Sequence, residues 1–562
     1  MANGVEAVQT VFLVLLVFVA VFAGLARRLK IPYPIVLVVA GLLVSFIPEI
    51  PRIRLNPDLV FLVLLPPLLY GAAWTLSWRE FQRNFARIAM LAVGLVTFSV
   101  LGVAGAAGWL LPGFDWRSGF LLGAVVAATD AIAATSIARR VGLPSRIVDI
   151  LEAESLVNDG TGLLAFQFGL MILMQGRSPS VVDGIGRLAF LMGAGVVVGL
   201  AIGAVVAWFE KWVDDGPIEI VIGILVPYVA YLAGNAVHAS GVLAVIACGM
   251  YMSRKSVEIF TPNVRLQTAA VWDALTFVLN GIVFVLIGLQ LPYVIGEALL
   301  VKDGGMSRLR LVEYGVGFSV VMIVVRMLWV FGETYAAYGL RRWMKTPGDA
   351  PEWRSVFVIG FTGMRGVLSL AAAFTLPFTL PGGGEFGQRS MIVFLTFCLI
   401  VATLVVQGLS LPWLIGRLGL ANPGRVNHEE EEARRVIVRE AIVFLDRAKA
   451  RQRRWVAEVQ SAGISVGAVG ASAGATAAAF DEVAGQYQRR LDAMPLFRQE
   501  TSVGQVDGTR RREVMLQAMQ VERTTLIRLR DEGEIDDEVL RTLQRELDLA
   551  ESRMYTGSNH AH

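Results

Sequence analysis

Long apolar stretches alternate with short polar segments along the first three quarters of the chain. Thirteen of these stretches approach the ~20 residues that a helix needs to cross a bilayer. They lie at about residues 8–26, 33–48, 59–76, 87–111, 117–138, 147–174, 185–209, 218–235, 240–253, 270–291, 311–338, 355–380 and 390–417. The pattern predicts an all-α polytopic membrane protein with about thirteen transmembrane helices.

Charged residues divide the chain into two unequal parts. Asp, Glu, Lys and Arg account for 53 of residues 1–420 and for 44 of the 142 residues at 421–562. Over the whole chain they make up 17%, against roughly a quarter in ordinary soluble proteins. We therefore expect a transmembrane domain at 1–420 and a polar tail at 421–562.

The tail has its own pattern. Residues 427–460 favour a helix with interspersed charges, and residues 510–554 favour two amphipathic helices that break at Gly533. Between them, the Ala/Gly/Ser-rich segment at about 461–480 is expected to be a linker, with a packed helix of small residues as the alternative. A role in regulation or in subunit contact is the interpretation we favour for this helical tail.

Basic residues in the loops predict the orientation. If the N-terminus is outside, the cytoplasmic loops carry 18 Lys and Arg residues and the outer loops carry 9. The positive-inside rule therefore places the N-terminus outside and the tail in the cytoplasm, as expected for a protein of the cell membrane. The first stretch does not look like a signal peptide, because no basic residue precedes it.

Five charged residues lie inside the predicted spans. At 1.5 Å of rise per helical residue, Asp130, Asp159, Arg326 and Arg365 fall near the middle of the membrane, and Glu154 lies nearer the cytoplasm. Charges at such depth are normally paired. Three acids and two bases leave one surplus negative charge, which suits one monovalent cation or one proton. The alternative is that these polar groups only hold helices together.

Three further acids, Glu152, Asp273 and Glu333, lie near the ends of predicted spans, and we expect them at the membrane interface. The two cysteines, Cys248 and Cys398, lie in apolar runs and are expected to be buried small hydrophobic residues. They predict neither a disulfide framework nor a metal site. The sequence has no phosphate-binding loop and no basic stripe for nucleic acid.

Helical spacing brings oxygen atoms together around the surplus charge. Ser155 and Asp159 are four residues apart and share one helix face, as do Glu154 and Asn158. Hydroxyl, carboxylate and carbonyl oxygens are the ligands that hard cations such as Na⁺ prefer, so no histidine or cysteine is needed. The spacing predicts that Ser155 adds a hydroxyl beside the Asp159 carboxylate.

Two predicted spans contain residues that favour an interruption. "AATDAIAATSIA" at 127–138 places polar residues in an alanine-rich span, and "GFTGMRGVLSL" at 360–370 places three glycines around an arginine. Irregular backbone at membrane depth occurs only where protein covers it or where it lines a cavity. A pair of interrupted helices is the best sequence indication of a transport site at the midplane.

Several motifs together resemble the cation:proton antiporter 1 family. They are "LLPPLLYGAAW" at 64–74, "TDAIAAT", "EAESLVNDGTG", "VVRMLWVF" and "GMRGVLSLA", in order and spacing over about residues 8–418. The resemblance implies two inverted repeats, two interrupted helices that cross, a core subdomain and a dimerisation subdomain, and a homodimer. It also implies exchange of Na⁺, or of K⁺ or Li⁺, for protons by alternating access, without enzymatic activity or a cofactor.

The resemblance also assigns roles to individual residues. Asp159 would hold either cation or proton, with Asn158, Thr129, Asp130 and Ser155 beside the transported Na⁺.

The remaining roles concern charge balance. Glu154 would pair with Arg326 as a brace, and Arg365 would balance Asp130 where the helices cross. Asn158 in place of an aspartate is similar to the electroneutral, one-for-one branch. One departure is Ala131, where many relatives have proline, which weakens the prediction that the span unwinds there.

Two other functions are compatible with parts of this pattern. A cation channel would use the same polar spans as a continuous pathway, but the intramembrane arginines and interrupted helices disfavour it. An intramembrane aspartic protease would use Asp130 and Asp159 as a dyad that shares a proton. The neighbouring arginines would instead keep both carboxylates ionised.

Overall fold

The computed structural model describes residues 2–47, 55–76, 78–175, 181–213, 215–299, 308–344, 350–381, 384–420, 423–461, 467–492 and 508–556. They form two compact units, one within Met1–Phe260 and Thr268–Asn422, the other within Thr261–Gln267 and Pro423–His562. In these residues the regular elements are helices, apart from one isolated bridge between Thr379 and Glu385.

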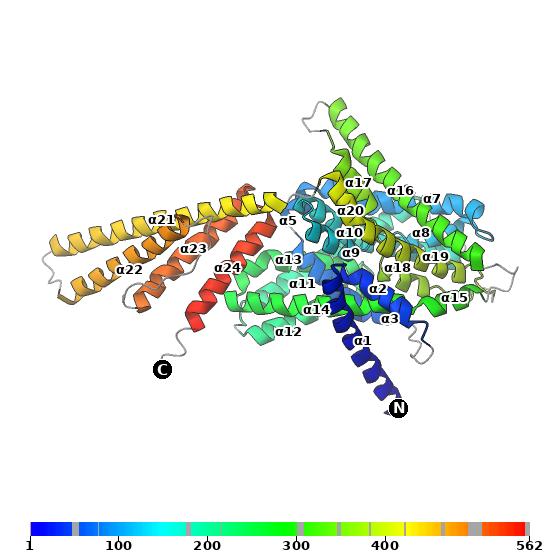
Figure 1. Cartoon of the computed structure of the whole chain (residues 1–562), viewed down its shortest axis with the longest axis horizontal. Helices are drawn as coiled ribbons and strands as arrows, with labels where there is room; N and C mark the ends of the chain where they lie inside the picture. The colour runs from blue at the N-terminus through cyan, green and yellow to red at the C-terminus, as the bar shows by residue number, and fades with distance from the viewer. Residues whose placement is uncertain are drawn as a thin grey trace. The chain divides into compact units, whose positions relative to one another are not determined.

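Each of the thirteen predicted stretches coincides with a helix or with a group of consecutive helical segments in the first unit (Figure 1). The uninterrupted helices are α1 (Ala2–Leu29), α2 (Tyr33–Val44), α10 (Ser145–Gln175), α11 (Val181–Glu210), α12 (Gly216–Ala236), α13 (Gly241–Ile259), α14 (Pro262–Leu289), α15 (Leu291–Leu299) and α16 (Arg308–Trp343). Among the described residues, nine helices are long and apolar enough to cross a membrane. The chain is therefore a multi-pass membrane protein, and the total of thirteen crossings stays a prediction.

Three other spans contain a π-helical turn. They are α3 (Pro57–Leu59), η1 (Val60–Leu64) and α4 (Leu65–Thr75); α6 (Phe85–Ala89), η2 (Met90–Gly94) and α7 (Leu95–Leu110), which follow the short α5 (Trp78–Arg83); and α19 (Arg389–Val401), η3 (Ala402–Gln407) and α20 (Gly408–Leu418). Such turns add one residue to a helix locally and shift the face that the following residues present. In the last of these turns, the Thr403 hydroxyl accepts a hydrogen bond of 3.1 Å from the backbone N–H of Arg365, at the second interruption described below.

Two spans are interrupted where the sequence predicts it. Five residues separate α8 (Trp116–Val125) from α9 (Ala131–Val141), and five separate α17 (Trp353–Phe361) from α18 (Val367–Phe374). The first interruption forms although residue 131 is alanine and not proline. Both segments are covered by protein, as irregular backbone at membrane depth requires.

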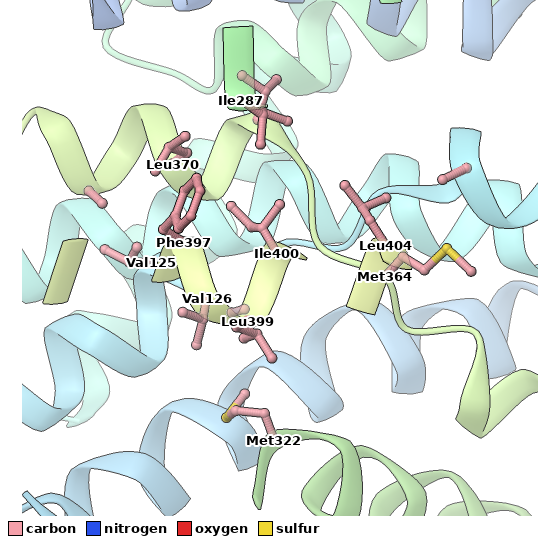
Figure 2. Close-up of a cluster of buried hydrophobic side chains, with 14 of the residues drawn as sticks. Val125, Val126, Ile287, Met322, Met364, Leu370, Phe397, Leu399, Ile400 and Leu404 are labelled. Carbon is pink, nitrogen blue, oxygen red and sulfur yellow. The ribbon is translucent and has the colours of Figure 1, made fainter. Parts of the chain in front are cut away.

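A continuous apolar core surrounds the interrupted helices. It includes Val125 of α8, Ile287 of α14, Met322 of α16, Leu370 of α18 and Phe397 of α19, all of them buried. Figure 2 shows these side chains converging from the separate helices. Because packed interiors tolerate little change in shape, this core fixes the two interruptions relative to α10 and α16.

The second unit is a bundle of four helices, α21 (Pro423–Ser461), α22 (Gly467–Asp492), α23 (Gly508–Glu532) and α24 (Asp537–Thr556). Each contributes to a separate core, with Ile437, Phe480, Leu526 and Leu543 as examples. The predicted break between the last two helices is confirmed: Gly533 adopts φ +82° and its N–H bonds the Leu529 carbonyl, which is a helix ending that favours glycine.

Two features of this unit differ from expectation or add to it. Residues 467–480 belong to helix α22 and not to a linker. Ala479 and Phe480, at the end of this segment, are buried in the core of the tail. The unit also includes the first turns of α14, where the Arg265 guanidinium pairs with the Asp548 carboxylate at 2.6 and 3.0 Å.

Candidate functional site

The two interrupted helices meet through their backbones. The N–H of Asp130 donates a hydrogen bond of 2.8 Å to the carbonyl of Met364. From the same segment, the Arg365 guanidinium donates to the carbonyls of Ala127 (3.0 Å) and Ala128 (3.3 Å), at the end of α8. The last carbonyls of a helix lack partners within it and carry partial negative charge. Arg365 therefore satisfies the carbonyl end of α8 inside the protein.

The opposite helix ends, with their free N–H groups, meet at Asp130. Its carboxylate accepts a hydrogen bond of 2.8 Å from the N–H of Ile132 and so caps α9. The same carboxylate lies against Gly366, the residue before α18: a Cβ there would stand 2.6 Å from Asp130 Oδ2. A negative charge at two helix N-termini is favourable, which accounts for an acid in this position.

Helix α10 contributes a row of polar side chains to the first interruption. The Ser155 hydroxyl donates to the Thr129 carbonyl at 2.6 Å, and Asn158 Nδ2 donates to the Thr129 hydroxyl at 3.1 Å. Asn158 is fully buried, and its Oδ1 atom has no hydrogen-bond partner among the described residues. The site thus contains an oxygen atom that is available to a ligand at the level of Thr129.

Asp159 differs from the other acids of the site. It follows Asn158 on α10, is half-buried, and makes no hydrogen bond or ion pair with another residue that the structure describes. Its carboxylate lies close enough to that of Asp130 for their charges to interact. Among the acids at the interruptions, Asp159 is therefore the one without a compensating group.

Glu154, one turn before Asn158, is fully compensated. Its carboxylate forms two hydrogen bonds with the guanidinium of Arg326 on α16, at 2.5 and 2.9 Å, and the side chains are only 1% and 4% exposed. Arg326 also donates to the carbonyls of Gly360 (3.2 Å) and Ile359 (3.1 Å) at the end of α17. Each interrupted helix therefore has one arginine at its carbonyl end: Arg365 for α8 and Arg326 for α17.

The sequence singled out eight residues around the first interruption. Seven of them make the contacts given above: Thr129, Asp130, Glu154, Ser155, Asn158, Arg326 and Arg365. The eighth, Asp159, follows Asn158 on α10. Arg365 binds backbone carbonyls and not the Asp130 carboxylate, which differs from the balance expected from the sequence. Backbone carbonyls leave no trace in a sequence pattern, so this partner could not be read from residue types.

Glu333, which the sequence placed at the membrane interface, is buried in the protein, with 9% of its surface exposed. It lies on α16, which continues to Trp343. Its depth in the membrane stays a prediction. Glu152, by contrast, pairs with Arg139 at 3.0 Å in a partly exposed position.

This arrangement has the chemistry of a small-cation or proton site. Thr129, Ser155 and Asn158 lie together at the first interruption, the carboxylates of Asp130 and Asp159 are close enough to interact, and Asp159 has no compensating partner among the described residues. The described residues contain no cluster of three His, Cys, Asp or Glu side chains that could hold a resident metal ion. Oxygen ligands with a single surplus negative charge suit a monovalent ion that binds reversibly, and not a permanently bound metal ion.

Comparison with known proteins agrees with this chemistry. The family described as "Sodium/hydrogen exchanger, transmembrane" matches residues 14–416. The "Uncharacterized Na(+)/H(+) exchanger YjcE" of Escherichia coli is 28% identical, with 96% of this chain and 98% of that protein covered. The "Sodium, potassium, lithium and rubidium/H(+) antiporter" of Bacillus pumilus is 29% identical; the match covers 77% of this chain and 66% of that protein.

A solved structure has the same fold. The sodium proton antiporter MjNhaP1 from Methanocaldococcus jannaschii matches with a TM-score of 0.58 at 20% identity, covering 74% of this chain and 100% of that one. At this identity the likeness concerns the fold alone. It supports the arrangement of the helices around the two interruptions.

Proposed function

Because the chain belongs to the sodium/hydrogen exchanger family, a family of transporters and not of enzymes, we propose that it exchanges one monovalent cation for one proton in each cycle at Asp159. The observation that carries the proposal is the charge balance of the site. Glu154 has Arg326 as its partner, and Asp130 caps a helix N-terminus. Asp159 has no partner among the described residues.

An uncompensated carboxylate at membrane depth must be neutralised, because a buried lone charge is costly. A proton and a cation each supply one positive charge, and each excludes the other from the same carboxylate. The competition couples the two fluxes: the protein reorients with either ligand bound, while the charged empty form stays in place. One cation then moves in one direction for each proton that moves in the other.

The neighbouring oxygens complete the coordination of the cation. Thr129 lies at the interruption between α8 and α9, and its carbonyl and hydroxyl already face Ser155 and Asn158. Together with Asp130 and Asp159, these groups offer the oxygen atoms that would replace the hydration shell of the cation. Oxygen ligands bind Na⁺, K⁺ and Li⁺ alike, so the size of the binding position selects among these cations.

Alternating access is the transport mechanism that this geometry supports. The two interruptions are joined through Asp130 and Met364 and capped by Arg326 and Arg365. We propose that they move as one body with α10 while other helices form the fixed part. The site then opens to one side of the membrane at a time, whereas a channel would keep a continuous pathway.

The location, the orientation and the assembly of the protein are part of the proposal. We propose a homodimer in the cell membrane, with the N-terminus outside and the tail in the cytoplasm, as the distribution of basic residues indicates. Na⁺ is the first cation to test, since the family description names sodium. K⁺ and Li⁺ follow, because both occur in the name of the Bacillus pumilus relative.

The test is cation-dependent dissipation of a pH gradient in proteoliposomes that contain the full chain. Adding Na⁺, K⁺ or Li⁺ outside acid-loaded vesicles should raise the internal pH in a saturable manner. Cation flux that continues without a proton gradient and without counter-transport would favour a channel. Cleavage of a transmembrane peptide with no ion flux would favour the aspartic protease. Either outcome would overturn the proposal.

A further inference from the structure

Glu333 is a buried carboxylate that the exchange site does not use. It lies on α16 in a buried stripe with Met322, Arg326 and Val330, which recur at the spacing of one helix face. Leu328 and Gly332, on other faces of the same helix, are exposed. An acid in a buried stripe normally has a partner, so the surroundings of Glu333 need an explanation.

The structure gives Glu333 no such partner. Its Oε2 atom is buried and unpaired, and neither of its oxygens makes a hydrogen bond or ion pair with another described residue. The charged groups that face it are Arg87, on α6, and Glu154, on α10, close enough for their charges to interact with it. Glu154 is already occupied by Arg326. Glu333 therefore has an oxygen available to a ligand next to the ion pair of the site.

The position of Glu333 along α16 indicates which side of the site it serves. It follows Arg326 by seven residues, about 10 Å of helix axis, towards the end that carries Arg341 and Arg342. Trp329, between the two, packs against Phe98 at 5.0 Å between ring centroids and donates to the Met90 carbonyl at 3.3 Å. Glu333 thus lies between the ion pair and the basic, cytoplasm-facing end of the helix.

We propose that Glu333 is an access site for the transported monovalent cation on the cytoplasmic side of Asp159. The inference rests on the exchange function and the orientation proposed above. A carboxylate along a narrow route raises the local concentration of cations and speeds their arrival. The neighbouring Arg87 keeps Glu333 from holding the cation strongly, so that the ion proceeds to Asp159. Glu333 does not take part in coordination at Asp159 itself.

The test compares the two faces of the membrane. Vesicles are prepared from cells that express the full chain. Everted vesicles expose the cytoplasmic face to added Na⁺, and right-side-out vesicles expose the outer face. Vesicles that contain the Asp159→Asn variant give the background flux. We expect Glu333→Gln to raise the half-saturating Na⁺ concentration about tenfold at the cytoplasmic face and to leave the outer face unchanged. Glu333→Asp should restore most of the cytoplasmic value.

The matched control is Glu313→Gln, which removes an exposed acid near the other end of α16 and should change neither face. Equal shifts at both faces, or a fall in thermal stability as large as that of Glu154→Ala, would show a structural role and overturn the inference. Unchanged half-saturation at both faces would overturn it while leaving exchange intact. If wild-type vesicles show no Na⁺-dependent proton flux, the proposed function itself fails, and the access site with it.

Discussion

The N–H of Asp130 donates to the carbonyl of Met364 over 2.8 Å, so the two interrupted helices touch through their main chains. So close an approach leaves no room for a side chain at residue 366. A Cβ on residue 366 would stand 2.6 Å from Oδ2 and 2.7 Å from Cβ of Asp130. Asp130 cannot move away freely, because its carboxylate also caps α9.

Gly366→Ala should therefore separate the two interruptions. We expect a loss of about 1–3 kcal/mol in stability, typical of an overpacked core, and a large loss of exchange, read from thermal unfolding and from proteoliposome flux. Gly332→Ala is the matched control, since a Cβ there meets nothing within 4 Å; it should change stability by less than about 0.5 kcal/mol. Equal behaviour of the two variants would contradict the close packing at Asp130.

Asp159→Asn should abolish exchange and leave the protein folded. The substitution removes the uncompensated charge, so neither cation nor proton has an anionic partner. Flux should fall to the level of empty liposomes, while thermal unfolding changes little because Asp159 has no partner among the described residues to lose. Asp273→Asn, which removes an exposed acid, should transport normally. Na⁺-dependent proton flux retained in Asp159→Asn would place the site elsewhere.

Exchange at one carboxylate should be electroneutral. A single negative charge that holds one cation or one proton moves no net charge in a cycle, so the membrane potential should not drive turnover. The initial rate of Na⁺ exchange should stay constant when valinomycin and K⁺ gradients clamp the potential at different values. A severalfold dependence on the potential would exclude one-for-one exchange, once transport of K⁺ itself has been measured in parallel.

The pair between Glu154 and Arg326 should brace α10 against α16 without binding the cation. Glu154→Ala and Arg326→Ala should each lower stability by roughly 3–5 kcal/mol, because each leaves a buried charge unpaired. The double variant should lose less than the sum of the two. A thermal-shift double-mutant cycle measures the coupling. Strong coupling of Arg326 to Asp159, with none to Glu154, would refute the brace.

The tail should lose stability as pH rises, through Glu522. This fully buried side chain accepts hydrogen bonds from Tyr487 (3.2 Å) and Arg490 (3.1 Å). Burial raises the pKa of Glu522 above its usual 4.5 and outweighs the lowering by these neighbours. The folded tail thus binds the proton more tightly than the unfolded tail. Its contribution to stability is complete below pH 4.5 and is lost as pH rises through the folded pKa.

Amide hydrogen exchange of α23 in the full chain, corrected for intrinsic rates, checks this prediction. Protection in α23 of the wild type should fall as the pH rises above 4.5 and through the raised pKa of Glu522. Glu522→Gln cannot ionise and should have a flatter profile over the same range. Equal pH dependence in both proteins would assign the effect to another group.

Much of the fold could be predicted from hydrophobic periodicity, because a membrane span needs a long apolar run and little else. The same rule predicts that Glu154 and Arg326 each have a partner at their depth, but only the resemblance to the antiporter family indicated that they pair with each other, as the structure shows. The two interruptions could be predicted from glycine and polar residues within apolar runs. In each case the apolar membrane restricts which residues are tolerated at a position, so the residue type alone indicates the local structure.

The features that could not be predicted from the sequence depend on contacts with backbone atoms and on packing between residues that are distant in the chain. Arg365 binds the backbone carbonyls of Ala127 and Ala128. Every residue has a backbone carbonyl, so the residue types do not reveal this partner. Glu333 is buried because it lies on the packed face of α16, which contacts helices such as α7 and α19 that are distant in the sequence. The alanine-rich part of α22 is a helix because it packs on other tail helices at Ala479 and Phe480, more than 40 residues from α21's core position Ile437.

Arg326 has two kinds of partner, and this restricts which substitutions the pair with Glu154 tolerates. Its guanidinium serves Glu154 and the carbonyl end of α17 at once. A compensated exchange of the two charges, with glutamate on α16 and arginine on α10, would preserve the ion pair but leave the carbonyls of Ile359 and Gly360 facing a second acceptor. The two carbonyls would then lose their donors inside the protein, so the charges of Glu154 and Arg326 are not interchangeable while α17 ends where it does.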